Sequence, residues 1–172
     1  MHPRKPPAIP LYSAAERRRR DASVWTTVQG LLAPLQFFIF LASLALVFRF
    51  LATGHGYEVA TLSIILKTVA LYVIMVTGSI WEKEVFGRYL FAPAFYWEDV
   101  VSMLVLALHT LYLAALAFDL LSPVALMLLA LLAYASYVIN AAQFLLKLRR
   151  ARLDHTASGH TARQPIGPEV LG

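Results

Sequence analysis

Four long apolar segments, separated by short polar connections, dominate the hydrophobic pattern of the chain. They lie at about residues 30–52, 59–81, 98–120 and 123–146. A helix of about 20 apolar residues crosses a hydrocarbon core of about 30 Å. Backbone exposed to lipid must satisfy its own hydrogen bonds, as a helix does. The pattern therefore predicts an all-α fold, an integral membrane bundle of four helices.

The composition leaves room for little besides these four segments. Of 172 residues, 59% are hydrophobic and 15% are charged, whereas soluble domains have about 45–50% apolar and about 25% charged residues. A separate soluble catalytic domain is thereby excluded, so any chemistry must take place within or beside the bundle. We expect three parts: a basic tail without regular structure at 1–28, a transmembrane domain at 29–148, and a basic polar tail at 149–172.

The positions of the basic residues predict the orientation. Thirteen of the 15 Lys and Arg residues lie outside the spans, with six in the N-terminal tail, two between spans two and three, and five in the C-terminal tail. The other two connections have none, so the positive-inside rule places both termini in the cytoplasm. The run 17–20 (RRRR) has the composition of a nucleic-acid patch, but its place just before a span favours an anchor on anionic headgroups. We expect no nucleic-acid partner.

Several classes of site are excluded by the residues present. The chain has no cysteine, which removes disulfides, thiolate zinc sites and iron–sulfur clusters. Phosphate-binding and dinucleotide-binding motifs are absent, as are the paired Glu-x-x-His motifs of a di-iron bundle. A haem held by two histidines is also excluded, because His109 is the one histidine within a span. We expect no cofactor and no metal of the protein's own.

Ionisable residues inside the spans need a reason, because a charge at the bilayer centre costs about 2.5–3.5 kcal/mol on insertion scales. Arg49 lies near the outer end of its span and can extend outward to the headgroups. Lys67 is about 13 Å deep in span two, and His109 is about 18 Å from the opposite surface in span three. The two therefore lie at nearly equal depth and either meet or face the same cavity.

The inner end of the bundle holds more polar groups. Glu82 closes span two, and Glu98 and Asp99 open span three. Glu98, Ser102, Val105 and His109 share one helical face, so a polar stripe leads from an acidic mouth to a histidine. Asn140 and Gln143 of span four lie near the same surface. Simpler explanations remain open: acidic residues favour a helix N-terminus, and amides join helices in membranes.

Half of the twelve residues from Phe86 to Trp97 are aromatic. An interfacial aromatic belt explains this composition, and so does a platform for a flat, amphipathic ring system. From the residues alone, acid–base chemistry on a substrate that dissolves in lipid is the remaining possibility.

Several strings of the sequence resemble one small membrane family, the 3-vinyl bacteriochlorophyllide hydratases. The resemblance extends over about residues 16–152. It is carried by the strings at 17–25 (RRRRDASVW), 28–34 (VQGLLAP), 80–87 (IWEKEVFG), 91–95 (FAPAF), 97–100 (WEDV), 107–110 (ALHT) and 140–147 (NAAQFLLK). It implies a lyase that hydrates the C3 vinyl group of chlorophyllide a, giving the 3-(1-hydroxyethyl) product in bacteriochlorophyll biosynthesis. Chlorophyllide a and water would be its substrates, with magnesium present only in the pigment.

No catalytic set comes with the resemblance, so the roles follow from physical chemistry. Hydration by vinyl protonation needs an acid that keeps its proton. We expect Glu98 to be that acid, because it shares the His109 face, and Asp99 or Glu82 to hold the water. His109 is either an axial ligand to the pigment magnesium or a proton relay. The expected substrate-binding residues are His109, Lys67, Arg88, Tyr89, Tyr96, Trp97, Asn140 and Gln143, with Lys67 or Arg88 pairing with the propionate carboxylate.

The alternative class of function is a non-enzymatic pigment-binding or assembly scaffold of the photosynthetic membrane. It would use His109 and the aromatic segment but would not need paired carboxylates. In either case we expect a multi-pass protein of the bacterial inner, photosynthetic membrane. A homo-oligomer or neighbouring enzymes of pigment synthesis are the partners considered.

Overall fold

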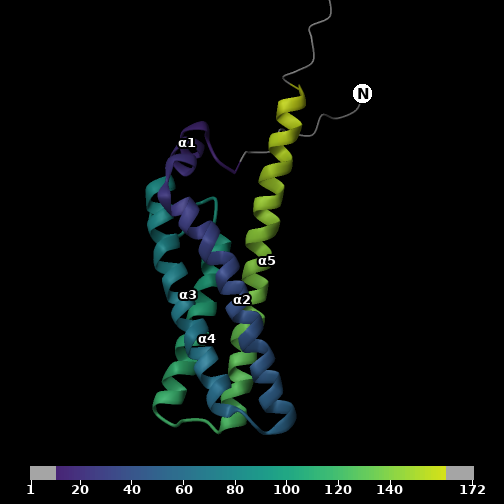
Figure 1. Ribbon diagram of the computed structural model, residues 1–172. Helices are drawn as coiled ribbons and strands as arrows, with labels where there is room; N and C mark the ends of the chain where they lie inside the picture. The colour runs from purple at the N-terminus through teal and green to yellow at the C-terminus, as the bar shows by residue number, and fades with distance from the viewer. Residues whose placement is uncertain (1–10, 162–172) are drawn as a thin grey trace, which may run out of the picture.

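The computed structural model describes the backbone of residues 11–161 and the side chains of residues 11–149. The described chain forms five helices and contains no strand: α1 (Ala14–Ala22), α2 (Val24–Thr53), α3 (Tyr57–Phe86), α4 (Tyr96–Ala117) and α5 (Pro123–Thr161). The helices α2 to α5 form an elongated bundle, and α1 lies at one end of it beside α3 (Figure 1). The all-α prediction is therefore confirmed.

The four predicted spans correspond to α2 through α5, each long and apolar enough to cross a membrane. Only the third is shorter than expected, because α4 ends at Ala117 and Asp119 takes a left-handed backbone conformation (φ 50°). Glycines end α2 and α3: Gly54 (φ 71°) and Gly87 (φ 82°) are left-handed, and each N–H closes the last turn. Glycine adopts this conformation without the steric cost that a Cβ atom adds.

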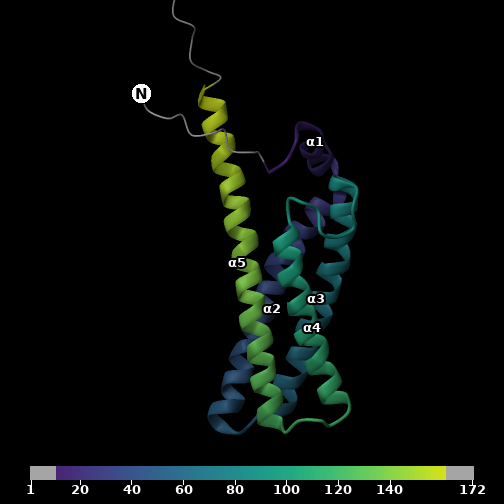
Figure 2. The same ribbon diagram turned by 180° about the vertical axis from the view of Figure 1, so that it is seen from behind.

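The helices associate as two hairpins. α2 packs most extensively on α3, and α4 packs on α5, whereas α3 and α4 contact each other far less. α1 and the C-terminal end of α5 lie at the same end of the molecule, where α5 projects past its neighbours (Figures 1 and 2). Four antiparallel helices bring both ends of the bundle's chain to the same side, because each helix reverses the direction of the one before it. The assignment of that end to the cytoplasm remains a prediction.

The bundle has apolar outer faces and an interior in which polar groups are set into a hydrophobic core. Large apolar side chains such as Phe38, Leu62, Leu104 and Leu132 are exposed on the outer faces, where a bilayer would cover them. The buried polar residues are Ser23, Gln36, Ser43, Lys67, Thr68, Glu82, Glu98, Asp99, Ser102, His109 and Ser136. Ionisable residues inside a membrane bundle are costly, so Lys67, Glu82, Glu98, Asp99 and His109 are candidates for a functional region.

The tail at 1–28, which was expected to lack regular structure, contains the helix α1. Ser13 and Glu16 form a reciprocal capping box that starts α1, with Ser13 N–H donating to the Glu16 carboxylate at 2.7 Å. These hydrogen bonds to Ser13 lower the pKa of Glu16. α5 runs to Thr161, well past the expected end of its span. The outermost parts of the two tails, residues 1–10 and 162–172, lie outside the described residues.

Candidate functional site

Two side chains with carboxyl groups face each other at the end of the bundle that carries α1. Glu82 lies in the last turn but one of α3, and Asp99 in the first turn of α4. Each residue is 4% exposed, and the two carboxyl groups are close enough to interact electrostatically. Two buried like charges at close range disfavour each other, so this arrangement favours one proton shared by the two carboxyl groups. We call Glu82 and Asp99 the carboxyl pair.

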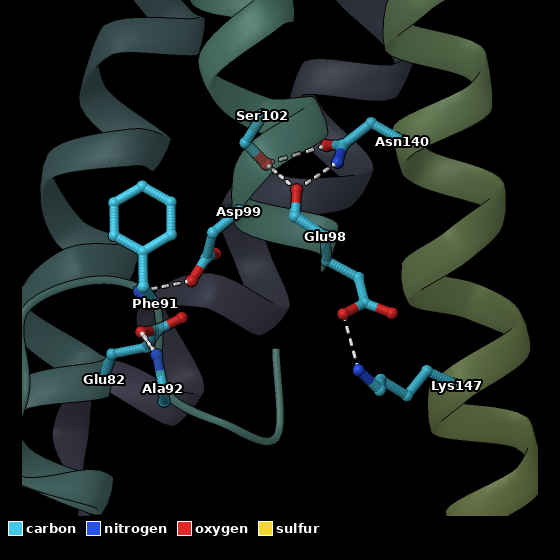
Figure 3. A network of polar contacts seen from close by, with 8 residues as sticks. All are labelled: Glu82, Phe91, Ala92, Glu98, Asp99, Ser102, Asn140 and Lys147. Atoms are coloured by element: carbon cyan, nitrogen blue, oxygen red, sulfur yellow. Dashed lines mark hydrogen bonds and ion pairs between the residues drawn. The ribbon is translucent and has the colours of Figure 1, made fainter. Parts of the chain in front are cut away.

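The connection between α3 and α4 holds the carboxyl pair in place. Phe91 N–H donates to Asp99 Oδ2 at 2.8 Å, and Ala92 N–H donates to Glu82 Oε2 at 3.3 Å (Figure 3). Phe91 has a left-handed backbone (φ 59°), which is costly for a residue with a Cβ atom. Strain of this kind persists where the surroundings over-determine it and clusters at functional sites.

Glu98 faces away from the carboxyl pair, toward α5. Lys147 Nζ donates to Glu98 Oε2 at 2.5 Å, and Asn140 Nδ2 donates to the Glu98 backbone carbonyl at 2.8 Å (Figure 3). Ser102 Oγ also donates to that carbonyl. The Glu98 carboxylate is therefore paired with a cation of α5. Glu98 thus joins α4 to α5 through Lys147 and Asn140, a contact that we call the Glu98–Lys147 clamp. This position suits a structural role better than the role of general acid that was expected for Glu98.

The Glu98–Lys147 clamp leads to a stability prediction. Replacing Lys147 by Met leaves a buried carboxylate unpaired and should lower the free energy of unfolding by about 1.5–3 kcal/mol. Thermal unfolding in detergent measures the loss. The double variant Lys147→Met with Glu98→Gln should recover most of it, because no buried charge is left unpaired. No recovery in the double variant would contradict the pairing.

A cluster of aromatic rings lies at the same end of the bundle as the carboxyl pair. Phe95 stacks on Phe144 of α5 with ring centroids 5.7 Å apart, and it contacts Trp81 of α3 at the same distance. Tyr12, which precedes α1, is 4% exposed and stacks on Phe86. Trp81, Phe95 and Phe144 stand out in the sequence by their aromatic side chains, and so does Tyr12, the one aromatic residue before Trp25.

The aromatic and basic residues expected to bind substrate at this end point elsewhere. Tyr89, Tyr96 and Trp97 are 60%, 47% and 69% exposed, as the interfacial belt requires. Arg88 is also exposed. Asn140 joins the Glu98 clamp, and Gln143 is half-buried with Oε1 unpartnered among the described residues. Among the described residues, no hydrogen bond or ion pair joins the side chains of these six to the carboxyl pair.

A second polar centre lies at mid-depth, where the sequence places Lys67 and His109 at the same level. Both residues are 0% exposed, and they are near enough to interact electrostatically. Lys67 Nζ lies 3.9 Å from the Tyr137 ring centroid, and the His109 ring is 5.9 Å from that of Tyr134. Neither Lys67 Nζ nor His109 Nε2 has a hydrogen-bond partner in the described part of the chain. We call Lys67 and His109 the mid-bundle pair.

The hydrogen bond of His109 defines its tautomer. Nδ1 lies 2.8 Å from the Val105 backbone carbonyl, which only accepts, so Nδ1 carries the proton. In a neutral imidazole, Nε2 then has a free lone pair. Ten residues of α4 separate Asp99 from His109, an axial rise of about 15 Å. The two centres are thus distinct, and a ligand must be large to touch both.

The described residues contain no group of three or more His, Asp or Glu arranged to hold a metal ion. A large, flat ligand with its own metal is the kind of molecule that would use a single imidazole lone pair in aromatic surroundings.

The chain matches known proteins over most of its length. A sequence model of the family 2-vinyl bacteriochlorophyllide hydratase matches residues 12–150. A protein of that name from Rhodobacter capsulatus is 63% identical over 152 residues, 88% of each chain. Another from Cereibacter sphaeroides is 62% identical over 156 residues, 88% of this chain and 96% of the relative. No solved structure matches. The chain therefore belongs to the 2-vinyl bacteriochlorophyllide hydratase family.

Proposed function

We infer that this protein hydrates the vinyl group of chlorophyllide a, producing the 1-hydroxyethyl derivative used in bacteriochlorophyll biosynthesis. The observation that carries the chemistry is the carboxyl pair, two buried carboxyl groups close enough to interact, an arrangement in which one shared proton avoids two like charges. Pigment and water are the substrates, and no further cofactor is needed, because a vinyl group plus water balances the product. The four apolar helices support a place in a lipid bilayer, which we propose to be the photosynthetic inner membrane.

Protonation of the vinyl group comes first in the proposed mechanism. The π electrons of the vinyl group form a new C–H bond at the terminal carbon with the proton of the carboxyl pair. The positive charge then lies on the carbon attached to the ring, where the conjugated macrocycle stabilises it. The carboxyl that supplied the proton becomes ionised, and the second negative charge of the pair stabilises the cation.

Water completes the reaction. A water molecule that donates a hydrogen bond to one of the carboxylates attacks the cation, forming the C–O bond, and it returns one proton to the pair. Glu82 and Asp99 thus begin and end each turnover with one shared proton. The backbone N–H groups of Phe91 and Ala92 hold both carboxyls in position throughout. Glu98 keeps its pairing with Lys147 and takes no part in proton transfer.

For His109 we favour ligation of the pigment magnesium over a proton relay. A relay passes a proton through both ring nitrogens, but Nδ1 of His109 is hydrogen bonded to a backbone carbonyl, which cannot carry a proton onward. The same bond aims the Nε2 lone pair, as the N–H to carbonyl bonds of metal-binding histidines commonly do. The neighbouring ring of Tyr134 offers a face for the macrocycle.

Incubation of membranes containing this protein with chlorophyllide a tests the function. Hydration removes the vinyl group from conjugation, so the absorption band should shift to the blue and the pigment should gain the mass of one water. Membranes with the double variant Glu82→Gln and Asp99→Asn serve as the control and should leave the pigment unchanged. Pigment that binds to the wild-type protein but stays unhydrated would instead support the scaffold function.

A further inference from the structure

The ammonium group of Lys67 has no anionic partner in the described structure. It is fully buried, and neither of the two ion pairs formed by the described residues includes it. The nearest acidic residues along α3 are Glu58, which is exposed, and Glu82, which is about 22 Å of helix away. A buried charge is retained when it pairs or hydrogen bonds with something. Lys67 therefore lacks a negatively charged group that a ligand would supply.

The surroundings of Lys67 are aromatic. Its Nζ lies against the face of Tyr137, whose ring is 5.1 Å from that of Phe40; Phe40 in turn lies 5.4 Å from Tyr134. A ring face stabilises a cation but leaves the three N–H donors of the ammonium unused. His109 is the other polar neighbour, and its free Nε2 lone pair carries no negative charge. One cation among flat apolar faces suits a planar molecule with a single carboxylate.

The location of the mid-bundle pair also fits entry from the membrane. Lys67 belongs to α3 and His109 to α4, the two adjacent helices that contact each other least along the bundle. The outer side of this seam is crossed by one hydrogen bond in the described structure, from Tyr72 to Thr110 at 2.8 Å. A ligand dissolved in lipid would reach Lys67 by separating these two helices.

We propose that Lys67 binds the free carboxylate of the pigment and thereby selects the unesterified acid over esterified pigments. The inference rests on the proposed substrate class, in which one propionate side chain is a free acid. An ester carries no charge, so its binding would leave the ammonium unpaired and buried. Discrimination of this kind is strong, because a site built for one polar partner rejects an analogue that lacks it.

The test compares chlorophyllide a with its propionate methyl ester, which has the same vinyl group. Affinities are measured by pigment fluorescence with the full-length protein in detergent. Wild-type protein should bind the acid at least about 30-fold more tightly than the ester, the lower end of the effect of removing one partner from a buried charge pair. Lys67→Met should lose this preference by weakening acid binding alone. Arg49→Met, which removes an exposed cation of α2, should keep it.

Two results would overturn the proposal: equal affinity of the wild-type protein for acid and ester, or a Lys67→Met variant that binds both more weakly with their ratio unchanged. The second result would reveal a merely structural lysine. Lys67→Gln, which keeps a polar side chain of similar size, is the second variant if the Met variant does not accumulate, and the same loss of preference is expected. Repeating the comparison in the double variant Glu82→Gln with Asp99→Asn, which should leave the pigment unhydrated, separates binding from turnover. A protein that selects the acid but fails to hydrate it would contradict the proposed reaction and not this inference.

Discussion

Replacing Glu82 by Gln or Asp99 by Asn should lower the rate of vinyl hydration by about a hundredfold to ten-thousandfold, the range of general acid–base catalysis. An amide keeps the shape of each side chain and accepts from the same backbone N–H group, but it cannot give its proton to a carbon atom. Pigment binding should remain, since neither residue is part of the mid-bundle pair. Initial rates with chlorophyllide a and the amount of bound pigment measure the two effects separately.

Non-additivity provides a sharper form of this test. If the two carboxyls act as one unit with one proton, the double variant should be little slower than the slower single variant. Independent roles would instead multiply the two losses. Glu58→Gln is the matched control, because Glu58 lies on the same helix and is exposed. Glu98→Gln should retain most activity. Loss of activity in Glu98→Gln, with activity kept in both Glu82→Gln and Asp99→Asn, would return the acid role to Glu98.

Removal of the His109 imidazole should lower pigment affinity by about tenfold or more. Outer partners of metal ligands alone account for about 10–100-fold in affinity, so the loss of the ligand itself should be at least comparable. The variant His109→Ala is compared with wild type by the pigment that co-purifies and by titration with chlorophyllide a. His55→Ala is the control, because His55 lies in the exposed connection between α2 and α3.

Added imidazole distinguishes ligation from other roles of His109. The alanine variant leaves a space the size of the lost ring, which free imidazole can fill, and a magnesium ligand should then be restored along with pigment binding. If His109 were only structural, added imidazole would not restore both pigment binding and the spectrum of the bound pigment. Unchanged pigment affinity with lost turnover would contradict ligation and favour the proton relay.

The transmembrane pattern and the shared face of α4 could be predicted because both depend on local rules. Helix length follows from the apolar segments, and residues separated by 3.6-residue turns point the same way. Glu98, Ser102, Val105 and His109 are all buried, as this periodicity requires. The equal depth of Lys67 and His109 follows from counting 1.5 Å per residue in two antiparallel helices. Family membership was also readable from short strings of sequence.

The ends of the helices were less predictable. The arginine run of residues 17–20 indicates a solvated tail by composition, but Ser13 and Glu16 cap a helix there, and Tyr12 and Arg19 attach it to the rest of the molecule. Arg19 Nε donates to the Val85 backbone carbonyl at 2.8 Å. Contacts between residues 66 positions apart leave no periodic signal, so the burial of Tyr12 depends on packing that composition does not encode.

The amino-acid sequence by itself determined four membrane-crossing helices, their depths, and the kinds of groups available for chemistry. Only the tertiary structure decided which groups meet. Glu98 and Asp99 are neighbours in sequence, yet a turn of about 100° per residue directs one toward Lys147 and the other toward Glu82. The rotation of α4 about its own axis, relative to α3 and α5, decides which of the two acidic residues faces Glu82 and which faces Lys147. That rotation is set by side-chain packing across helices, which periodicity along one helix does not specify.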